Sequence, residues 1–367
     1  MKVLITGADG FIAKNLISHL DILDIDIIKC FRKTNIEKII SETNNIDFIF
    51  HLAGVNRPNK LSEFSEVNLG LTKNICDLLC KYNIKAPILF SSSTQATSNN
   101  EYGKSKLNAE KVLSDFSSSN SSSVYIFRLP NVFGKWSKPN YNSVVATFCF
   151  NTINGNVHKI DDKEKILHLA YIDDVVSEFI EILRNQPKGY HCFDFKKIFK
   201  TTLLDLSNTI QSFKLGRIKN QIASVGLGLE RCLYATYLSF YKPDDFIHKL
   251  NPHNDARGIF AEVLKTFDSG QFSFFTIYPG KVRGDHYHHT KNEKFVVLSG
   301  SARFGFRNII TDELFEIKVS GKDYFIVDSI PGWTHNIKNI GNSDLVVLLW
   351  SNEIFDSENP DTIAYKV

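Results

Sequence analysis

The sequence lacks the features of a membrane protein, of a secreted disulfide-rich protein and of a nucleic-acid-binding protein. Its 367 residues carry a formal net charge of only +3, which is too small to hold a polyanion or an anionic membrane surface. No apolar run approaches the roughly 20 residues that a membrane-spanning helix needs. The first residues lack the charged and apolar regions of a signal peptide. We therefore expect a cytoplasmic protein with no membrane insertion and no nucleic-acid partner.

Cysteine is scarce and has no functional spacing. Cys76 and Cys80 fall one helical turn apart in an apolar segment, which is typical of buried thiols. None of the six cysteines belongs to a metal-type pair, and no repeat of solenoid length is present. We therefore expect neither a disulfide framework nor a repeat architecture. The cysteines all precede residue 240 and are Cys30, Cys76, Cys80, Cys149, Cys192 and Cys232.

The sequence does contain enough apolar material for two hydrophobic cores. Apolar residues make up 43% of the chain and charged residues 23%, and a chain of this length is long enough for two domains. The segment Tyr241–Asp245 is interpreted as a linker, which predicts domains at residues 1–245 and 246–367. The serine-rich run Ser117–Ser123 is short and is predicted to be a loop inside the first domain.

The first residues predict a dinucleotide site. An apolar strand over Met1–Thr6 precedes Gly7-Ala8-Asp9-Gly10-Phe11-Ile12-Ala13, whose glycines allow a helix N-terminus to approach a pyrophosphate closely. Arg32 and Lys33 stand where an NAD site places an acid, and they suit a 2′-phosphate instead. The expected cofactor is therefore NADPH. The predicted cofactor contacts are Gly7, Gly10, Phe11, Ile12, Arg32, Leu52, Ala53, Tyr102 and Lys106.

A serine, a tyrosine and a lysine form the predicted reaction centre. Tyr102 and Lys106 stand four residues apart at the start of an expected helix. They therefore share one face, and the ammonium is expected to lower the pKa of the phenol. Ser93 ends an expected strand and is placed to donate a hydrogen bond to the substrate oxygen. For Tyr102 and Lys106 taken alone, an ordinary exposed helix pair is the alternative.

These motifs resemble the extended short-chain dehydrogenase/reductase family, as do His51-Leu52-Ala53-Gly54 and the segment Arg128–Gly134. The resemblance implies an α/β domain with a doubly wound parallel sheet of the Rossmann type. Sugar 4,6-dehydratases of that family follow the serine with an Asp-Glu pair, whereas Thr94 and Gln95 follow Ser93 here. The acid typical of the NAD-retaining carbon-4 epimerases is also missing. The first domain is therefore predicted to be an NADPH-dependent reductase.

The second domain carries four residues with the spacing of a metal site. His286 and His288 point to one side of an expected strand because successive strand side chains alternate, and Glu293 can meet them from a neighbouring strand. His335 follows a later apolar run. The set resembles the cupin family, all-β jelly-roll barrels that hold one ion with three histidines and a glutamate. Such ligands suit zinc, iron, nickel or manganese, of which zinc is favoured, while His289 is expected to be solvated.

A further motif lies just after the linker. The string Asp255-Ala256-Arg257-Gly258-Ile259-Phe260-Ala261-Glu262 resembles the N-terminal strand motif of the deoxysugar epimerases. Arg257 offers a fixed fork of donors that suits a diphosphate or a sugar oxygen. A turn with a surface salt bridge is the alternative. His253 is either a base or a strand-edge residue.

The order of the two domains is similar to that of the CapF family of bifunctional capsular-polysaccharide enzymes. This resemblance implies that the cupin inverts carbon 3 of a UDP-linked 2-acetamido-2,6-dideoxy-4-ketohexose before the reductase reduces carbon 4. The implied product is UDP-2-acetamido-2,6-dideoxy-L-talose, on the route to UDP-N-acetyl-L-fucosamine for capsule or O-antigen. Cupins commonly pair, so a homodimer is expected, and Asn131 and Lys135 are candidates for substrate contact. The resemblance runs through four strings: His51–Pro58, Gly134–Trp136, Lys138–Ser143 and His288–Phe295.

Two other functions stay open. In the first, the cupin only dimerises the chain, which is then a single-function ketosugar reductase. Exchange of the carbon-3 hydrogen with solvent deuterium separates this from the bifunctional enzyme. In the second, the chain is a regulatory module that senses nucleotide sugar and NADPH. The set of Ser93, Tyr102 and Lys106 argues against the second.

Overall fold

The chain forms two compact units in the computed structural model, which describes residues 1–43, 45–58, 60 and 62–367. The N-terminal unit contains Met1–Gln211 and Arg231–Tyr241, and the C-terminal unit contains Ser212–Glu230 and Lys242–Val367. The last passage between the units therefore follows Tyr241, inside the expected linker. In the part of the chain that the structure describes, no helix combines the length and apolarity that crossing a bilayer requires.

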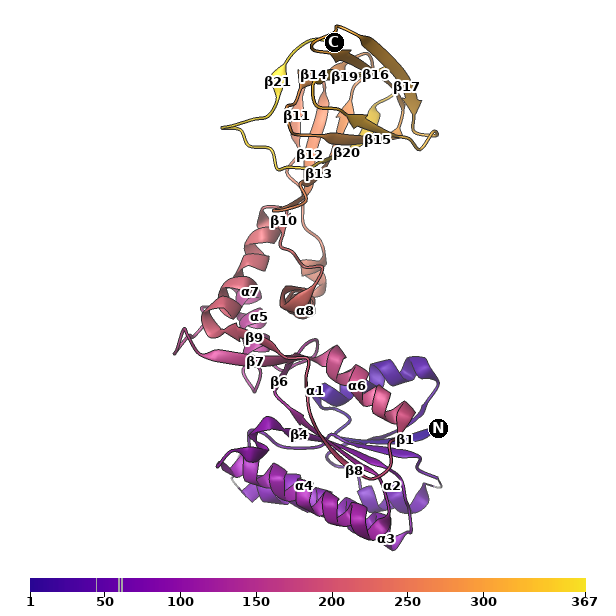
Figure 1. The fold of residues 1–367 in the computed structure, drawn as a ribbon, viewed down its shortest axis with the longest axis vertical. Helices are drawn as coiled ribbons and strands as arrows, with labels where there is room; N and C mark the ends of the chain where they lie inside the picture. Colours follow the sequence, from indigo (N-terminus) through magenta and orange to yellow (C-terminus); the bar gives the residue numbers. More distant parts are fainter. Residues whose placement is uncertain (44, 59, 61) are drawn as a thin grey trace. The chain divides into compact units, whose positions relative to one another are not determined.

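A six-stranded sheet forms the centre of the N-terminal unit (Figure 1). Its strands are β1 (Lys2–Thr6), β2 (Asp26–Cys30), β3 (Phe48–His51), β4 (Ile88–Ser93), β5 (Val124–Leu129) and β8 (Tyr190–Asp194). They lie in the order β2-β1-β3-β4-β5-β8, and every pairing along this order is parallel. The chain thus adds β2 on one side of β1 and then crosses back to add β3, β4, β5 and β8 on the other side. This confirms the predicted doubly wound α/β fold.

Helices cover both faces of this sheet. They are α1 (Phe11–Leu20), α2 (Ile36–Glu42), α3 (Leu71–Lys81), α4 (Glu101–Asn120) and α6 (Ile172–Asn185). Val3 and Ile5 of β1 pack in one apolar cluster with α1 and α6, whereas Leu4, which points the other way, packs with α2, α3 and α4. Because both faces are buried, the inner strands β1, β3 and β5 carry apolar residues on both faces instead of alternating with polar residues.

Helix α4 extends further than the sequence predicts. The Asn100 side chain caps its first turn by accepting a hydrogen bond from the Gly103 amide at 2.8 Å, and the helix continues to Asn120. The run expected to be a loop is therefore half helical. Ser118 and Ser119 donate their hydroxyl protons to carbonyls four residues back, so they are satisfied inside the helix. The helix ends where Ser121 takes a left-handed conformation.

A smaller lobe completes the N-terminal unit. Strands β6 (Asn131–Phe133), β7 (Ile166–Tyr171) and β9 (Phe199–Thr202) form a three-stranded sheet. The other helices of the chain are α5 (Val144–Asn154), α7 (Leu203–Ile218) and α8 (Gly228–Leu238). Shorter helical turns are η1 (Asp21–Leu23), η2 (Phe64–Gly70), η3 (Thr94–Thr97) and η4 (Pro243–Phe246).

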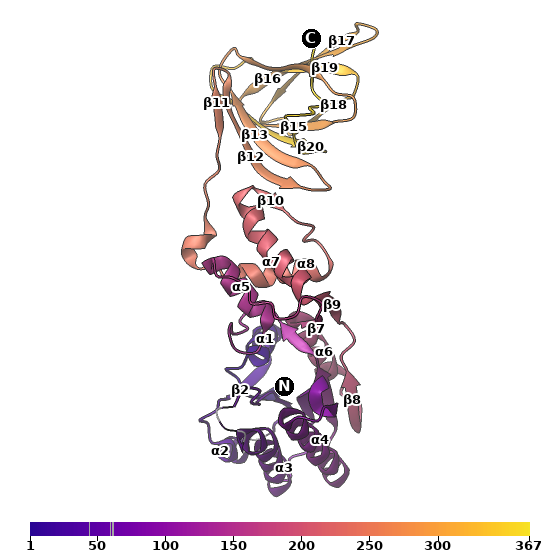
Figure 2. The same ribbon diagram turned by 90° about the vertical axis from the view of Figure 1, so that its left-hand side faces the viewer.

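The C-terminal unit is built from two facing sheets, as Figure 2 shows. The larger contains β10 (Gln221–Ile222), β11 (His253–Asp255), β12 (Gly258–Thr266), β13 (Gln271–Ile277), β20 (Leu345–Ser351), β15 (Glu293–Ser299) and β18 (Ile326–Ser329). The smaller contains β17 (Leu314–Ser320), β16 (Ser301–Asn308), β19 (Trp333–Asn339), β14 (Val282–Tyr287) and β21 (Ile363–Ala364). Side chains alternate between core and surface along these strands, so Val347 and Leu349 of β20 join the core. This all-β unit confirms the predicted fold class.

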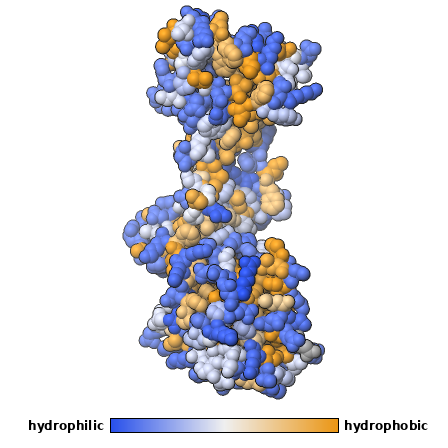
Figure 3. Space-filling model, turned by 45° about the vertical axis from the view of Figure 1, so that its right-hand side comes forward, coloured by the Kyte–Doolittle hydropathy of each residue, from blue (hydrophilic) through white to orange (hydrophobic). Residues whose placement is uncertain are grey.

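The outer face of the larger sheet is apolar. It carries a groove of about 330 Å³, formed by the side chains that alternate with the buried ones on four strands. On the side of the molecule seen in Figure 3, apolar residues also gather in a band on the C-terminal unit. The groove is lined by Phe272, Lys294, Val296, Ile326, Leu348 and Trp350.

Candidate functional sites

The glycine-rich turn after β1 borders a cavity of about 600 Å³. Gly7 has a φ of +67°, and a Cβ at this position would lie 2.8 Å from the Cα of Ala53. Only glycine fits both the conformation and the close approach. Gly10 donates its amide proton to the Gly7 carbonyl at 2.8 Å, which closes the turn directly before α1. The N-terminus of α1 therefore stands beside a cavity large enough for part of a dinucleotide.

Most of the predicted cofactor contacts meet at this cavity. Gly7, Gly10, Leu52 and Ala53 line it together with Arg32. The Arg32 guanidinium is exposed and lies 3.4 Å from the Glu63 carboxylate. The predicted residues Phe11, Ile12, Tyr102 and Lys106 line the neighbouring cavity instead.

The neighbouring cavity, of about 380 Å³, brings together the serine, tyrosine and lysine predicted from the sequence. Ser93 ends β4, while Tyr102 and Lys106 lie on successive turns of α4. Lys106 is buried, and its Nζ donates a hydrogen bond to the Ser91 carbonyl at 2.9 Å. Leu52 borders both cavities. A bound dinucleotide can therefore extend from the glycine turn to the tyrosine.

The expected effect of Lys106 on the Tyr102 pKa is not found. Burial raises the pKa of Tyr102, and the hydrogen bond with Ser93 opposes this only in part. Burial also lowers the pKa of Lys106 to about 8, against the opposing charge of Glu110. The sequence showed that the two side chains share a helix face but not that both are withdrawn from water, and desolvation favours the neutral form of each group.

A buried carboxylate behind Lys106 was missed in the sequence. Glu110 is 3% exposed, accepts a hydrogen bond from the Ser92 hydroxyl, and is held by the Arg128 guanidinium. It stands four residues after Lys106, on the helix face that already carries Tyr102. This spacing is the signal that could have identified it.

Of the two candidates for substrate contact, only Asn131 lines the reaction cavity in the structure. Asn131 lines the cavity of Ser93 and Tyr102. Lys135 instead forms an ion pair with Asp173, with 2.6 Å between Nζ and Oδ1, and is not among the residues that line either cavity. Further polar residues that line the reaction cavity, and that were missed in the sequence, are Gln95, Asn142, Lys165 and His168.

The four predicted metal ligands meet in the C-terminal unit. One potential ligand atom from each of His286, His288, Glu293 and His335 lies within 4.8 Å of the others. His286 is paired with His335 across β14 and β19 of the smaller sheet, and His288 follows β14 directly. Glu293 begins β15 of the larger sheet. The carboxylate therefore comes from the facing sheet and not, as expected, from a neighbouring strand.

The electrostatics of this cluster suit a divalent cation. Oε2 of Glu293 lies 3.2 Å from Nε2 of His288 and 3.3 Å from Nε2 of His335. Burial acts to raise the pKa of Glu293, but its hydrogen bonds with both histidines outweigh burial and hold the pKa below its usual range. Burial also lowers the pKa of His286 to about 4. A carboxylate beside three imidazoles is a ligand set that binds zinc, and the buried Nδ1 of His335 has no hydrogen-bond partner among the described residues.

The metal-ligand cluster opens into a cavity of about 330 Å³ that Arg257 also lines. The Arg257 guanidinium lies 2.6 Å from the Asp255 carboxylate, which Arg283 approaches at 3.2 Å. The surface salt bridge considered from the sequence is thus present, at the mouth of the cavity. His253, which could have been a base, is exposed on the edge strand β11 and is not among the lining residues.

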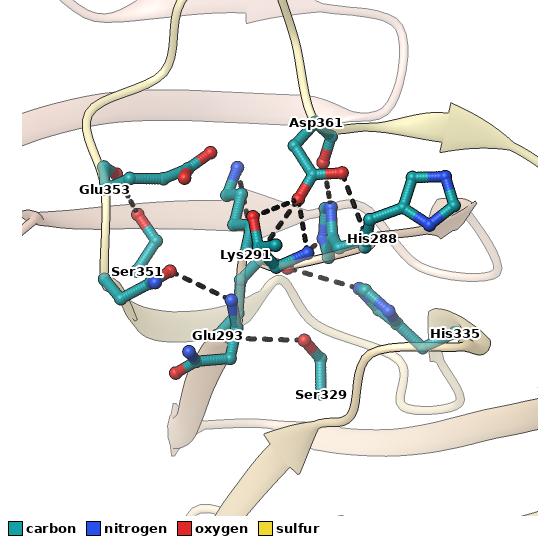
Figure 4. Close-up of polar contacts among 12 residues, drawn as sticks. His288, Lys291, Glu293, Ser329, His335, Ser351, Glu353 and Asp361 are labelled. Carbon is teal, nitrogen blue, oxygen red and sulfur yellow. Dashed lines mark hydrogen bonds and ion pairs between the residues drawn. The ribbon is translucent and has the colours of Figure 1, made fainter.

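Two charged residues beside the cluster were missed in the sequence. Lys291 is 7% exposed, and its Nζ lies 3.5 Å from Oε1 of Glu293. Asp361 contacts the turn between His288 and Glu293 (Figure 4). Asp361 stands 68 residues after Glu293 in the sequence, and no motif connects them.

Comparisons with known proteins match segments in both units of the chain. Residues 3–193 match the NAD dependent epimerase/dehydratase family, and residues 253–363 match the polysaccharide biosynthesis C-terminal domain. A UDP-2-acetamido-2,6-beta-L-arabino-hexul-4-ose reductase from Pseudomonas aeruginosa is 46% identical over 368 residues, which cover 100% of this chain and 99% of the relative.

Solved structures resemble the chain in whole and in part. The capsular polysaccharide assembling protein CapF of Staphylococcus aureus is 41% identical, with a TM-score of 0.92 and full coverage of both chains. A UDP-N-acetylglucosamine 4-epimerase from Bacillus cereus covers 68% of this chain and 99% of its own, with a TM-score of 0.56 and 18% identity. That second likeness shows the fold alone.

Proposed function

This chain belongs to the CapF family, and from that premise we propose that its N-terminal domain, residues 1–245, is an NADPH-dependent 4-ketosugar reductase. One observation carries the proposal: Ser93, Tyr102 and Lys106 line a single cavity that meets the glycine-turn cavity at Leu52. The name of the Pseudomonas aeruginosa relative supports a UDP-linked 2-acetamido-2,6-dideoxy-4-ketohexose as the substrate.

The residues of this cavity have the chemistry of a carbonyl reduction. NADPH supplies a hydride when it is bound. Ser93 donates a hydrogen bond to the keto oxygen, and Tyr102 transfers its phenolic proton to that oxygen as the alkoxide forms. Because burial raises the pKa of Tyr102, the phenol holds its proton until the alkoxide develops. Lys106 provides a positive charge beside the cofactor ribose, and Asn131 contacts the sugar.

The C-terminal domain, residues 246–367, is proposed to invert carbon 3 of the same ketosugar. A 4-ketone acidifies the neighbouring carbon-hydrogen bond, so a base on one face and a proton source on the other can invert that centre through an enolate. Reduction removes the ketone and with it this acidity. Epimerisation therefore precedes reduction, and the product is UDP-2-acetamido-2,6-dideoxy-L-talose, a precursor of UDP-N-acetyl-L-fucosamine for capsule or O-antigen.

A zinc ion is the proposed partner of the metal-ligand cluster. His286, His288, Glu293 and His335 would hold it, and a bound zinc ion polarises a carbonyl oxygen. Arg257 lines the same cavity and offers donors to the sugar or its diphosphate.

The apolar groove on the larger sheet supports a homodimer, which analytical ultracentrifugation tests. The enzyme is proposed to act in the cytoplasm.

The decisive experiment supplies the purified chain with the UDP-linked ketosugar in deuterated water. With NADPH, we expect nicotinamide oxidation and the talose product. Without NADPH, we expect exchange of the carbon-3 hydrogen, which a metal chelator abolishes. Tyr102→Phe should lose reduction and keep exchange. If NADPH is consumed but carbon 3 never exchanges, the chain is a single-function reductase, and if neither reaction occurs the proposal fails.

A further inference from the structure

The chain after β20 returns across the metal-ligand cluster as a C-terminal strap, residues 352–367. Its strand β21 pairs antiparallel with β14, opposing Ala364 to the ligand His286. Phe355 and Thr362 of the strap line the same cavity as His286 and Glu293. The strap therefore forms one wall of this cavity and lies beside the strand that carries the first ligand.

The Asp361 carboxylate fastens the strap to the turn between two ligands. Oδ1 accepts the amide proton of His289 at 2.8 Å, and Oδ2 accepts those of Thr290 at 2.7 Å and Lys291 at 2.8 Å. Oδ2 also accepts the Thr290 hydroxyl at 3.1 Å. Burial acts to raise the pKa of Asp361, but these backbone hydrogen bonds outweigh it and hold the pKa below its usual range. Three successive amides of this turn are thus bound by one carboxylate (Figure 4).

The main chain of Asp361 acts on a ligand directly. Its carbonyl oxygen contacts Nδ1 of His288, which is 2% exposed. A carbonyl can only accept, so Nδ1 donates to it, and Nε2 is the ring nitrogen that faces the cluster. That Nε2 faces Oε2 of Glu293 at 3.2 Å. The strap therefore orients the His288 ring so that Nε2 is the atom available to a metal inside the cluster.

We propose that Asp361 is a positioning residue of the metal site, through which docking of the C-terminal strap and metal binding are coupled. The proposal rests on the metal site assigned under the proposed function. The carboxylate fixes the turn that sets the spacing of His288 and Glu293, while the carbonyl fixes the ring orientation of His288. A metal that binds better to the docked state stabilises docking by the same factor by which docking raises metal affinity.

The test measures metal binding by the full chain. The purified protein is stripped of metal and titrated with Co²⁺ against a competing chelator, with the visible cobalt spectrum as a second readout. Asp361→Ala and Asp361→Asn should weaken Co²⁺ binding about 10–100-fold and change the spectrum. The asparagine variant is informative because its amide would present N–H groups to the backbone N–H groups of the turn.

A matched control lies in the same strap. The Asp356 carboxylate accepts the Glu358 amide at 2.8 Å, whereas the amides of the turn donate to Asp361. Asp356→Asn should therefore leave Co²⁺ affinity and spectrum at the wild-type values. If Asp361→Ala lowers only the melting temperature of the metal-free protein and binds Co²⁺ like the wild type, Asp361 is merely structural and the proposal is wrong.

Protease sensitivity provides a test that needs no variant. If strap docking and metal binding are coupled, Co²⁺ should slow proteolytic cleavage within residues 352–367 of the wild-type chain. Equal cleavage rates with and without Co²⁺ would overturn the proposed coupling. A wild-type chain that takes up no Co²⁺ yet still reduces the ketosugar contradicts both the metal site and the strap proposal. That result leaves the reductase assignment intact, so the two failures are distinguishable.

Discussion

Arg128 holds the buried carboxylate of Glu110 with two hydrogen bonds, from Nη2 to Oε2 at 2.7 Å and from Nε to Oε1 at 3.2 Å. The pair joins β5 to α4 directly behind the reaction cavity. Glu110 is also the charge that raises the pKa of Lys106 against the effect of burial. The ion pair thus connects the stability of the N-terminal domain to the protonation of a residue in the proposed reaction centre.

Replacing Glu110 with glutamine should destabilise the protein. The change leaves the partly buried Arg128 without its counter-charge, and breaking one side of such a pair costs about 3 kcal/mol. Urea unfolding should show this fall in the free energy of unfolding. Glu101→Gln is the matched control on the same helix, since Glu101 pairs with Lys104 at the surface and should change stability by less than about 1 kcal/mol. Equal effects of the two substitutions would contradict this account.

The pH dependence of reduction should follow Lys106. Its pKa is lowered from 10.5 to about 8 in the folded protein, so its ammonium is present below about pH 8 and is lost above. Measured with NADPH as the varied substrate, kcat/KM reports the free enzyme and should fall as the pH rises through about 8. In Glu110→Gln this fall should move to lower pH because the charge that raises the Lys106 pKa is gone. A profile that is the same in both proteins would show that Lys106 does not control the rate.

The same shift has a consequence for stability, with a definite sign. Between about pH 8 and 10.5 the unfolded chain keeps a proton on Lys106 that the folded chain has released. Stability therefore rises with pH across this window, because the cost of burying the ammonium is complete below about pH 8 and disappears by about pH 10.5. This describes the contribution of Lys106 alone.

Local motifs predicted the fold and most of both sites. The glycine turn, the Tyr102–Lys106 spacing and the alternation of His286 and His288 are each encoded within a few residues. The glycine turn and Ser93 also follow two parallel strands, whose carboxyl ends lie at one edge of the sheet. These are the features for which short-range sequence is sufficient.

The residues that were missed depend on contacts between distant segments. Asp361 reaches His288 across 73 residues, and Arg128 reaches Glu110 from a different element. The direction of the Tyr102 pKa was wrong for a related reason, since burial is a property of the packed structure. Glu293 was expected on a neighbouring strand and lies on the facing sheet, because spacing along a chain cannot distinguish the two.

Replacing Gly7 with alanine should abolish cofactor binding. The substitution forces a side chain into a φ of +67° and brings its Cβ to 2.8 Å from the Ala53 Cα. The strain alone costs about 1–3 kcal/mol, and relieving it would shift the turn that approaches the pyrophosphate. NADPH fluorescence titration measures the loss. Gly226→Ala is the control, because a Cβ there meets no atom within 4 Å, and NADPH binding should be unchanged.

Arg32 should determine the preference for NADPH over NADH. Its guanidinium lines the cofactor cavity and contacts the Glu63 carboxylate at 3.4 Å in an exposed ion pair, which breaks at little cost. Hydrogen bonds to a charged phosphate contribute about 1.5–3 kcal/mol, so Arg32→Ser should raise the KM for NADPH about 10–100-fold. The KM for NADH, which has no 2′-phosphate, should stay within about twofold, as expected when no such contact is lost.

Lys33→Ser tests the specificity of this effect, because Lys33 is not among the residues that line the cavity. If Arg32→Ser raised both KM values equally, Arg32 would act on a part that the two cofactors share, and the assignment of NADPH to this site would lose its basis.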